Sequence, residues 1–203
     1  MDVSNFDQAI ALDASGEGRY RGQTHPGYAN MVGPFGGVTA ATALNAVLQH
    51  PDLLGEPVSL TVNFCAAVAD GAFDVIAEPS RTNRSTQHWA VSIEQAGQTV
   101  LTATAITAVR RSTWSVQDER MPAALSPAAM GRPNMAAQVA WVQRYDIRIA
   151  EGAIPRVWDG SGEASRPTLW VRDEPPRALD FVSLTALCDV FYPRVRLRRA
   201  KRV

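Results

Sequence analysis

The carboxyl group of Asp189 occurs in a setting that suits general base catalysis. A helical pattern covers about residues 179–191 and is closed by Pro193, and its spacing places Asp189 on the same mostly apolar face as Val182 and Ala186. Burial and the negative end of the helix dipole both disfavour a charged carboxylate, so we expect its pKa to be raised. A carboxylate with a raised pKa is a good base for activating water. The alternative is an Asp that simply faces solvent at a helix end.

An earlier helix carries no charged residue. The stretch from Gly22 to Pro51 contains no Asp, Glu, Lys or Arg, although these residues make up 20% of the chain. We expect a helix from Gly37 to about His50, with Gly36 just before it. Glycines at this position let another group approach the free N–H groups and the positive dipole end of the helix. They would serve equally well if they only allowed a strand to pack closely on the helix.

Four segments after this helix alternate between apolar and polar residues, as strands with one buried face do. They cover residues 59–64, 73–78, 89–93 and 101–109, and short turns join them. The pattern predicts an antiparallel meander. The uncharged helix must cover its buried face, so we expect the sheet to wrap around that helix. A helix enclosed in this way has almost no solvated face, which explains its lack of charge.

The second half of the chain partly repeats the first. Strand patterns resume at residues 141–149 and 168–171 and lead into the helix that carries Asp189. The segment Thr185–Val190 of this helix matches four of the six residues of Thr42–Val47 in the earlier one. Each strand-then-helix order ends at a proline. We therefore interpret the chain as two related α+β units.

Residues 112–137 contain three prolines and no alternation, so we expect a linker there. The first unit then covers residues 1–111 and the second covers residues 138–203. The second unit lacks the strands that follow the helix in the first. We expect it to expose an unpaired sheet edge and apolar helix surface.

The composition indicates neither nucleic acid nor a membrane as a partner, because 20 Lys and Arg balance 20 Asp and Glu. No apolar run reaches the roughly 20 residues of a membrane span, and the N-terminus lacks the basic region of a secretion signal. We expect Cys65 and Cys188 to be reduced thiols, with Cys188 in the core. The spacing of His25, His50 and His88 does not suggest a metal site. These features predict a cytoplasmic protein without a metal.

Four stretches resemble the acyl-CoA thioesterases of the TesB-like, double-hotdog kind: GPFGGVTAATALNAV, VSLTVNFCAAVADGAFDV, RTNRSTQHWAVSIEQAGQTVLTATA and LWVRDEPPRALDFVSLTALCDVFYP. The resemblance implies a hotdog fold in each unit, with a sheet wrapped around a central helix and the two half-sheets joined edge to edge. It also implies hydrolysis of fatty acyl-CoA to free fatty acid and CoA by Asp-assisted attack of water, without metal or organic cofactor.

The resemblance aligns the family's catalytic Asp with Asp189. The Thr and Gln that act with it in the family come from strands after the helix, which this sequence does not contain. The candidate substrate-binding residues are Gly36, Gly37, Arg84 and Ser85. We expect acyl-CoA as the substrate and a homo-oligomer as the assembly.

The arginine-rich end of the chain, from Arg194 to Arg202, is expected to be a solvated loop or to contact the phosphates of CoA. Two other functions stay open. A non-catalytic hotdog protein that binds acyl-CoA or acyl-carrier protein would explain the missing Thr and Gln. A hotdog hydratase is less well supported, because no Asp and His have the spacing that its chemistry needs.

Overall fold

The computed structural model of the chain describes residues 4–134, 138–152, 159–162 and 165–199. Its α-helices are α1 (Asn5–Ala9), α2 (Gly36–Leu48) and α3 (Phe181–Leu187). Its strands are β1 (Asp13–Gly16), β2 (Arg19–Gln23), β3 (Glu56–Phe64), β4 (Ala72–Thr82), β5 (Thr86–Gln95), β6 (Gln98–Ala108), β7 (Tyr145–Glu151) and β8 (Thr168–Asp173). Short 3-10 helices are η1 (Pro26–Tyr28), η2 (Pro127–Ala129), η3 (Ala140–Arg144) and η4 (Arg194–Leu197).

Six strands form an antiparallel sheet in the order β1-β2-β4-β5-β6-β3. The four predicted strands are present, and β4, β5 and β6 form the predicted meander. The prediction is wrong for β3, which pairs with β6 at the edge of the sheet and does not pair with β4. Alternation identifies the residues of a strand but not its neighbour, because both edges of a meander offer unpaired N–H and C=O groups. The β1-β2 hairpin was not predicted, since every residue of β1 is exposed and the segment shows no alternation.

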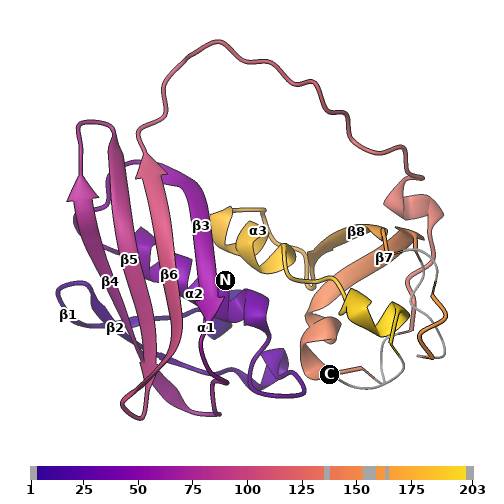
Figure 1. Ribbon diagram of the computed structural model, residues 1–203, viewed down its shortest axis with the longest axis horizontal. Coiled ribbons are helices and arrows are strands. Elements are labelled where there is room, and N and C mark those ends of the chain that lie inside the picture. The colour runs from indigo at the N-terminus through magenta and orange to yellow at the C-terminus, as the bar shows by residue number, and fades with distance from the viewer. Residues whose placement is uncertain (1–3, 135–137, 153–158, 163–164, 200–203) are drawn as a thin grey trace.

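The uncharged helix α2 lies across the inner face of this sheet, as predicted (Figure 1). Ala43 and Val47 on one side of α2 join a buried cluster with Trp89 of the sheet. Leu44 on the other side joins a second buried cluster with Ala186 of α3. A charged side chain on either side would be buried without solvent. The lack of charge in α2 therefore follows from burial on both sides.

The second half of the chain contributes β7 and β8, which form a separate antiparallel pair, and the helix α3. Figure 1 shows α3 between this pair and the large sheet. A strand was predicted to begin at Trp141, but this residue belongs to the 3-10 helix η3. As expected for the second unit, Leu184 of α3 is 48% exposed, and among the described strands β7 and β8 pair only with each other, which leaves an edge of each unpaired.

The helix α3 is shorter than the predicted range of residues 179–191. Its N-terminus is set by Asp180, whose carboxylate accepts a hydrogen bond from the Ser183 N–H at 2.8 Å. The arginine-rich segment that follows is partly ordered as η4 and is not a plain loop. Lys201 and Arg202 of that segment lie outside the described residues. Within the described residues, no helix is both long enough and apolar enough to cross a bilayer.

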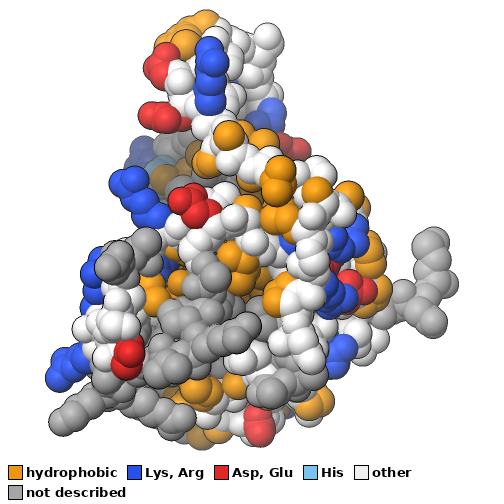
Figure 2. All heavy atoms as spheres, turned by 90° about the vertical axis from the view of Figure 1, so that its right-hand side faces the viewer, with side chains coloured by type: hydrophobic (Ala, Val, Ile, Leu, Met, Phe, Trp, Pro, Cys, Tyr) orange, Lys and Arg blue, Asp and Glu red, His pale blue; other side chains and the backbone are white. Residues whose placement is uncertain are grey.

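The segment between β6 and η2 has no helix or strand and arches over the molecule (Figure 1). In the view turned by 90° it stands out as a projection at the top of the molecule (Figure 2). Its far end is fastened to the outer face of β7 and β8. Arg148 donates to the carbonyl oxygens of Pro127 and Met130, and the Trp170 indole N–H donates to Leu125 O at 2.9 Å.

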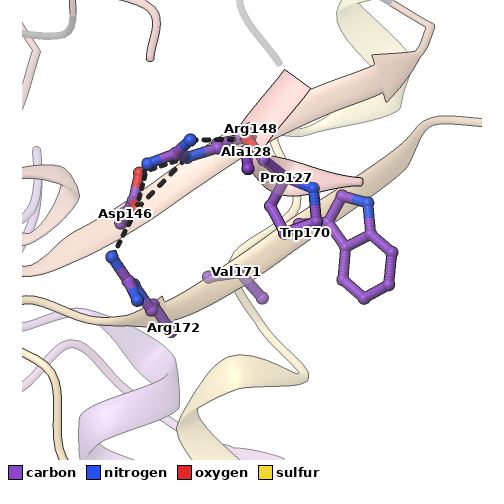
Figure 3. A pocket seen from close by; sticks show the side chains of 7 residues that line it. All are labelled: Pro127, Ala128, Asp146, Arg148, Trp170, Val171 and Arg172. Carbon is purple, nitrogen blue, oxygen red and sulfur yellow. Dashed lines mark hydrogen bonds and ion pairs between the residues drawn. The ribbon is translucent and has the colours of Figure 1, made fainter. Parts of the chain in front are cut away.

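The anchor of this attachment is Asp146, which is 5% exposed and is bonded by Arg148 at 3.0 Å and Arg172 at 3.2 Å. Figure 3 shows these side chains around a pocket of about 360 Å³ between Pro127 and the strand pair. The hydrogen bond from Arg148 lowers the pKa of the Asp146 carboxyl. The carboxylate is therefore charged at neutral pH and holds Arg148 in the orientation that binds the linker.

Candidate active site

Asp189 lies just after the end of α3. The Cys188 N–H still bonds to Leu184 O at 3.1 Å, but the Asp189 N–H bonds to Ala186 O at 3.1 Å. This change from i→i−4 to i→i−3 hydrogen bonds tightens the backbone and ends the helix. The turn brings the Asp189 carboxylate to the first turn of α2, where it accepts a hydrogen bond from the Gly37 N–H.

The two glycines of α2 make room for this contact. A Cβ atom on Gly36 would lie 2.7 Å from Asp189 Oδ2. A Cβ atom on Gly37 would lie 2.6 Å from the backbone oxygen of Ala186 in α3 and 2.5 Å from the ring of Phe35. The glycines therefore admit the second helix and its carboxylate, and Gly36 also admits the ring of Phe64 from strand β3. The structure thus brings together Gly36, Gly37 and Asp189, three of the predicted site residues.

Two opposing effects act on the pKa of the Asp189 carboxyl. Loss of hydration raises it, and the hydrogen bond from Gly37 lowers it by favouring the carboxylate. Loss of hydration is the larger effect, so the pKa is raised, as predicted. The predicted role of the dipole is wrong in part, because the carboxylate meets the positive end of the 13-residue helix α2, which favours its charge. Asp189 as a whole is still exposed, so water can reach it.

Aromatic rings close one side of the site. Trp141 stacks on Phe35 with ring centroids 4.1 Å apart, and Tyr145 meets both rings edge-on at 6.0 Å. The Tyr145 hydroxyl is buried and has no hydrogen-bond partner among the described residues. Burial, with smaller effects that include the charges of Asp173 and Asp189, raises the pKa of Tyr145. The hydroxyl is therefore a protonated, unused donor near the candidate base.

A buried carboxyl group, Asp173, lies across the β7-β8 pair from Tyr145. The Ser183 hydroxyl of α3 donates to Asp173 Oδ2 at 2.5 Å, whereas Oδ1 has no partner among the described residues. Burial raises the pKa of Asp173. Neither Tyr145 nor Asp173 was predicted as a polar group of the interior. A signal was present, because Asp173 continues the period-two alternation of Leu169 and Val171, both packed on the second core cluster.

A cavity of about 290 Å³ opens beside Gly36. The missing Cβ of Gly36 would lie 3.2 Å from Phe64 Cζ, so Phe64 and the Asp189 carboxylate flank the same glycine. No charged residue lines this cavity, whose walls are Val32, Pro34, Gly36, Thr39, Phe64, Cys65, Ala66, Ala67 and Val68. The candidate base therefore lies beside a neutral space that suits a hydrocarbon chain.

The remaining predicted site residues lie elsewhere. Arg84 and Ser85 occupy the turn between β4 and β5, where the Ser85 carbonyl accepts a hydrogen bond from the Val109 N–H. The nearby Gln87 side chain bonds to Asp52, in the segment that follows the C-terminal end of α2. The structure does not bring them to Asp189, and their role in substrate binding stays a prediction. Cys188 is exposed, so its predicted place in the core is wrong: α3 ends before it, and the turn directs it outward. In the described part of the chain, no three His, Cys, Asp or Glu side chains gather as a metal site would need.

A sheet that encloses a central helix, with a second helix packed on the first, defines this protein as a member of the hotdog fold class, an α+β fold. Residues 25–108 match the family model of the acyl-CoA thioesterase N-terminal domain, and residues 118–203 match that of the acyl-CoA thioesterase C-terminal domain. The chain belongs to the acyl-CoA thioesterase family of the TesB-like, double-hotdog kind, as its sequence motifs predict.

Solved structures agree with this fold. A conserved protein of unknown function with a hot dog fold from Alicyclobacillus acidocaldarius is 44% identical, with a TM-score of 0.88 over 98% of this chain and 74% of that chain. An acyl-CoA thioesterase II, TesB2, from Mycobacterium marinum is 21% identical, with a TM-score of 0.69 over 92% of this chain and 67% of that chain. A tesB protein of Mycobacterium avium subspecies paratuberculosis is 20% identical, with a TM-score of 0.72 over 92% and 68%. No curated protein matches the sequence.

Proposed function

We propose that this protein hydrolyses fatty acyl-CoA to free fatty acid and CoA, with Asp189 as the general base. One observation carries the proposal: a carboxylate with a raised pKa lies at the start of α2, beside an uncharged cavity. The exposure of Asp189 lets water reach the carboxylate, and the cavity beside Gly36 would take the acyl chain. The hydrogen bond from Gly37 would help to orient the base.

In the proposed reaction, the Asp189 carboxylate takes a proton from a water molecule while the water oxygen forms a bond to the thioester carbonyl carbon. The carbonyl electron pair moves onto oxygen and gives a tetrahedral oxyanion. N–H groups in the first turn of α2 would donate hydrogen bonds to this oxyanion, aided by the positive end of the helix. The oxyanion then collapses, the C–S bond breaks, and the CoA thiolate takes the proton back from Asp189.

The proposal is tested by measuring the release of free thiol from octanoyl-CoA by the wild-type protein and by Asp189→Asn. The amide keeps the size and the acceptor oxygen of the side chain but cannot take a proton. We expect kcat to fall by roughly 10²–10⁴-fold, the usual contribution of a general base. We also expect wild-type activity to rise with pH through a pKa above the ordinary Asp value, because only the carboxylate acts as the base.

Equal rates for the two proteins would remove Asp189 from the mechanism. Binding of octanoyl-CoA without turnover by either protein would instead favour a non-catalytic acyl-CoA binding protein, the alternative that the sequence leaves open. Calorimetry on the same two proteins separates these outcomes, because it measures binding whether or not hydrolysis follows.

A further inference from the structure

The cavity beside Asp189 continues inward as a much smaller space. This inner space has a volume of about 10 Å³ and lies between α2 and the strands β4 and β5. Pro34, Thr39 and Val68 line both spaces and therefore separate them. Phe73 and Ile93 line only the inner space and close it on the side of the sheet.

Several polar groups along this path have hydrogen-bond partners within the protein. The Thr39 hydroxyl donates to Phe35 O at 3.2 Å, and the Thr42 hydroxyl donates to Val38 O at 2.9 Å. His25 at the inner space accepts from the Gly27 N–H, and burial lowers its pKa, which keeps the imidazole neutral. The path therefore presents no charged side chain to a ligand.

The barrier at Val68 is held in place by its backbone. Val68 is 8% exposed and belongs to the core cluster of the large sheet. Its carbonyl oxygen packs against Gly33, where a Cβ atom would lie 2.4 Å away, and Gly33 has a φ of +66°. Since the two backbones already touch, Val68 has little room to retreat from a ligand.

We propose that the outer cavity binds the acyl chain of the substrate and that Val68, with Pro34 and Thr39, limits the chain to about octanoyl length. This inference rests on the function proposed above. The cavity of about 290 Å³ is at the lower end of the range for small-molecule sites. At about 30 Å³ for a group of the size of water, it has room for roughly eight to ten such groups. A longer chain would have to pass Val68 into a space too small to receive it.

The test measures kcat/KM for acyl-CoA substrates from acetyl to palmitoyl. For the wild type we expect kcat/KM to rise by up to about fourfold per methylene, from the usual gain on burying a CH₂ group. This rise should stop near octanoyl, which gives the profile a break at that chain length. Val68→Ala joins the two spaces and should move the break to a longer chain, whereas Val68→Phe should move it to a shorter one. Val91→Ala is the matched control, because it removes the same two methyl groups from a buried valine of the same core that does not line either space.

A second measurement does not depend on turnover. Cys65 is an exposed, free thiol that lines the outer cavity. In a Cys188→Ala background it is the single cysteine of the chain, since the sequence has two. We expect the inert thioether S-octyl-CoA to slow the reaction of Cys65 with a maleimide, and CoA itself to slow it far less.

The outcomes separate the two proposals. If no acyl-CoA is hydrolysed, the proposed function fails, and the protection of Cys65 alone then decides whether the cavity binds the chain. If hydrolysis occurs but Val68→Ala and Val91→Ala give the same chain-length profile as the wild type, the inference about Val68 is wrong. If S-octyl-CoA does not slow the reaction of Cys65 and the chain-length profile of Val68→Ala is the same as that of the wild type, the cavity is excluded as the acyl site.

Discussion

At the scale of single residues, the two adjacent glycines of α2 have different tasks. Gly36 borders a side-chain oxygen of Asp189, which can move, whereas Gly37 borders the backbone of α3 at Ala186, which cannot. A side chain at the first position therefore displaces the candidate base, and one at the second position displaces a helix. The same substitution at the two positions separates catalysis from stability.

Gly36→Ala should reduce kcat/KM strongly, by up to about 10²-fold, because a shift of about 1 Å in a catalytic group has that effect. The melting temperature of the Gly36→Ala protein should differ little from that of the wild type, since Ala is not disfavoured in a helix. Gly37→Ala is the paired variant and should lower the free energy of unfolding by about 1–3 kcal/mol, the usual cost of overpacking. Thermal unfolding and thiol release on both proteins check this, and a large loss of stability in Gly36→Ala would contradict it.

At the scale of elements, α3 is too short to be stable by itself and depends on its contacts. Asp180 caps its N-terminus, Ala186 packs on α2, and Ser183 bonds to the buried Asp173 of β8. The Ser183 hydroxyl thus ties the helix to the strand pair. Because burial raises the pKa of Asp173, this tie also makes stability depend on pH.

Asp173 has a higher pKa in the folded protein than in the unfolded chain, so between these two values the folded state binds more protons. Its contribution to stability is therefore present at low pH and is lost as the pH rises through the folded-state pKa. Asp173→Asn keeps an acceptor for Ser183 and removes this loss. Urea unfolding at about pH 4 and about pH 7 measures the free energy of unfolding of both proteins. The free energy of the variant, relative to that of the wild type, should be higher at about pH 7 than at about pH 4. A difference that is the same at both pH values would contradict the prediction.

At the scale of the whole molecule, the two halves are joined by direct contacts, which include the stacking of Trp141 on Phe35 and the ion pair of Arg177 with Asp7, and by the linker. The helices α2 and α3 pack on each other, the Asp189 carboxylate bonds to α2, and the linker is fastened to the outer face of β7 and β8. The linker is the longest segment without helix or strand in the described chain, and most of its residues are exposed. Arg148 is the centre of its attachment, because one guanidinium group bonds to both Asp146 and the linker backbone.

Arg148→Met should release residues 125–132 from the strand pair. Hydrogen exchange of a peptide that covers this segment should become faster, while exchange in β4 to β6 should stay the same. Arg110→Met is the control, since Arg110 forms an ion pair with Glu56 on the exposed surface of the large sheet. Equal exchange of the segment in the wild type and in Arg148→Met would show that other contacts hold the linker.

The sequence predicts much of this arrangement for identifiable physical reasons. The lack of charge in α2 reflects burial on both sides, and strict alternation marks β3 to β6. Strand order could not be predicted, because edge pairing leaves no local pattern, so the place of β3 was missed. The site was predicted in part: Asp189 and the two glycines are identified by type and spacing. That the carboxylate meets the start of α2 depends on a contact between residues about 150 positions apart, which no local pattern encodes.

The hydrogen bond between Asp189 and Gly37 joins groups from the two halves of the chain, so neither half alone would contain the candidate site. Because both halves belong to one polypeptide, the two groups stay together at any protein concentration.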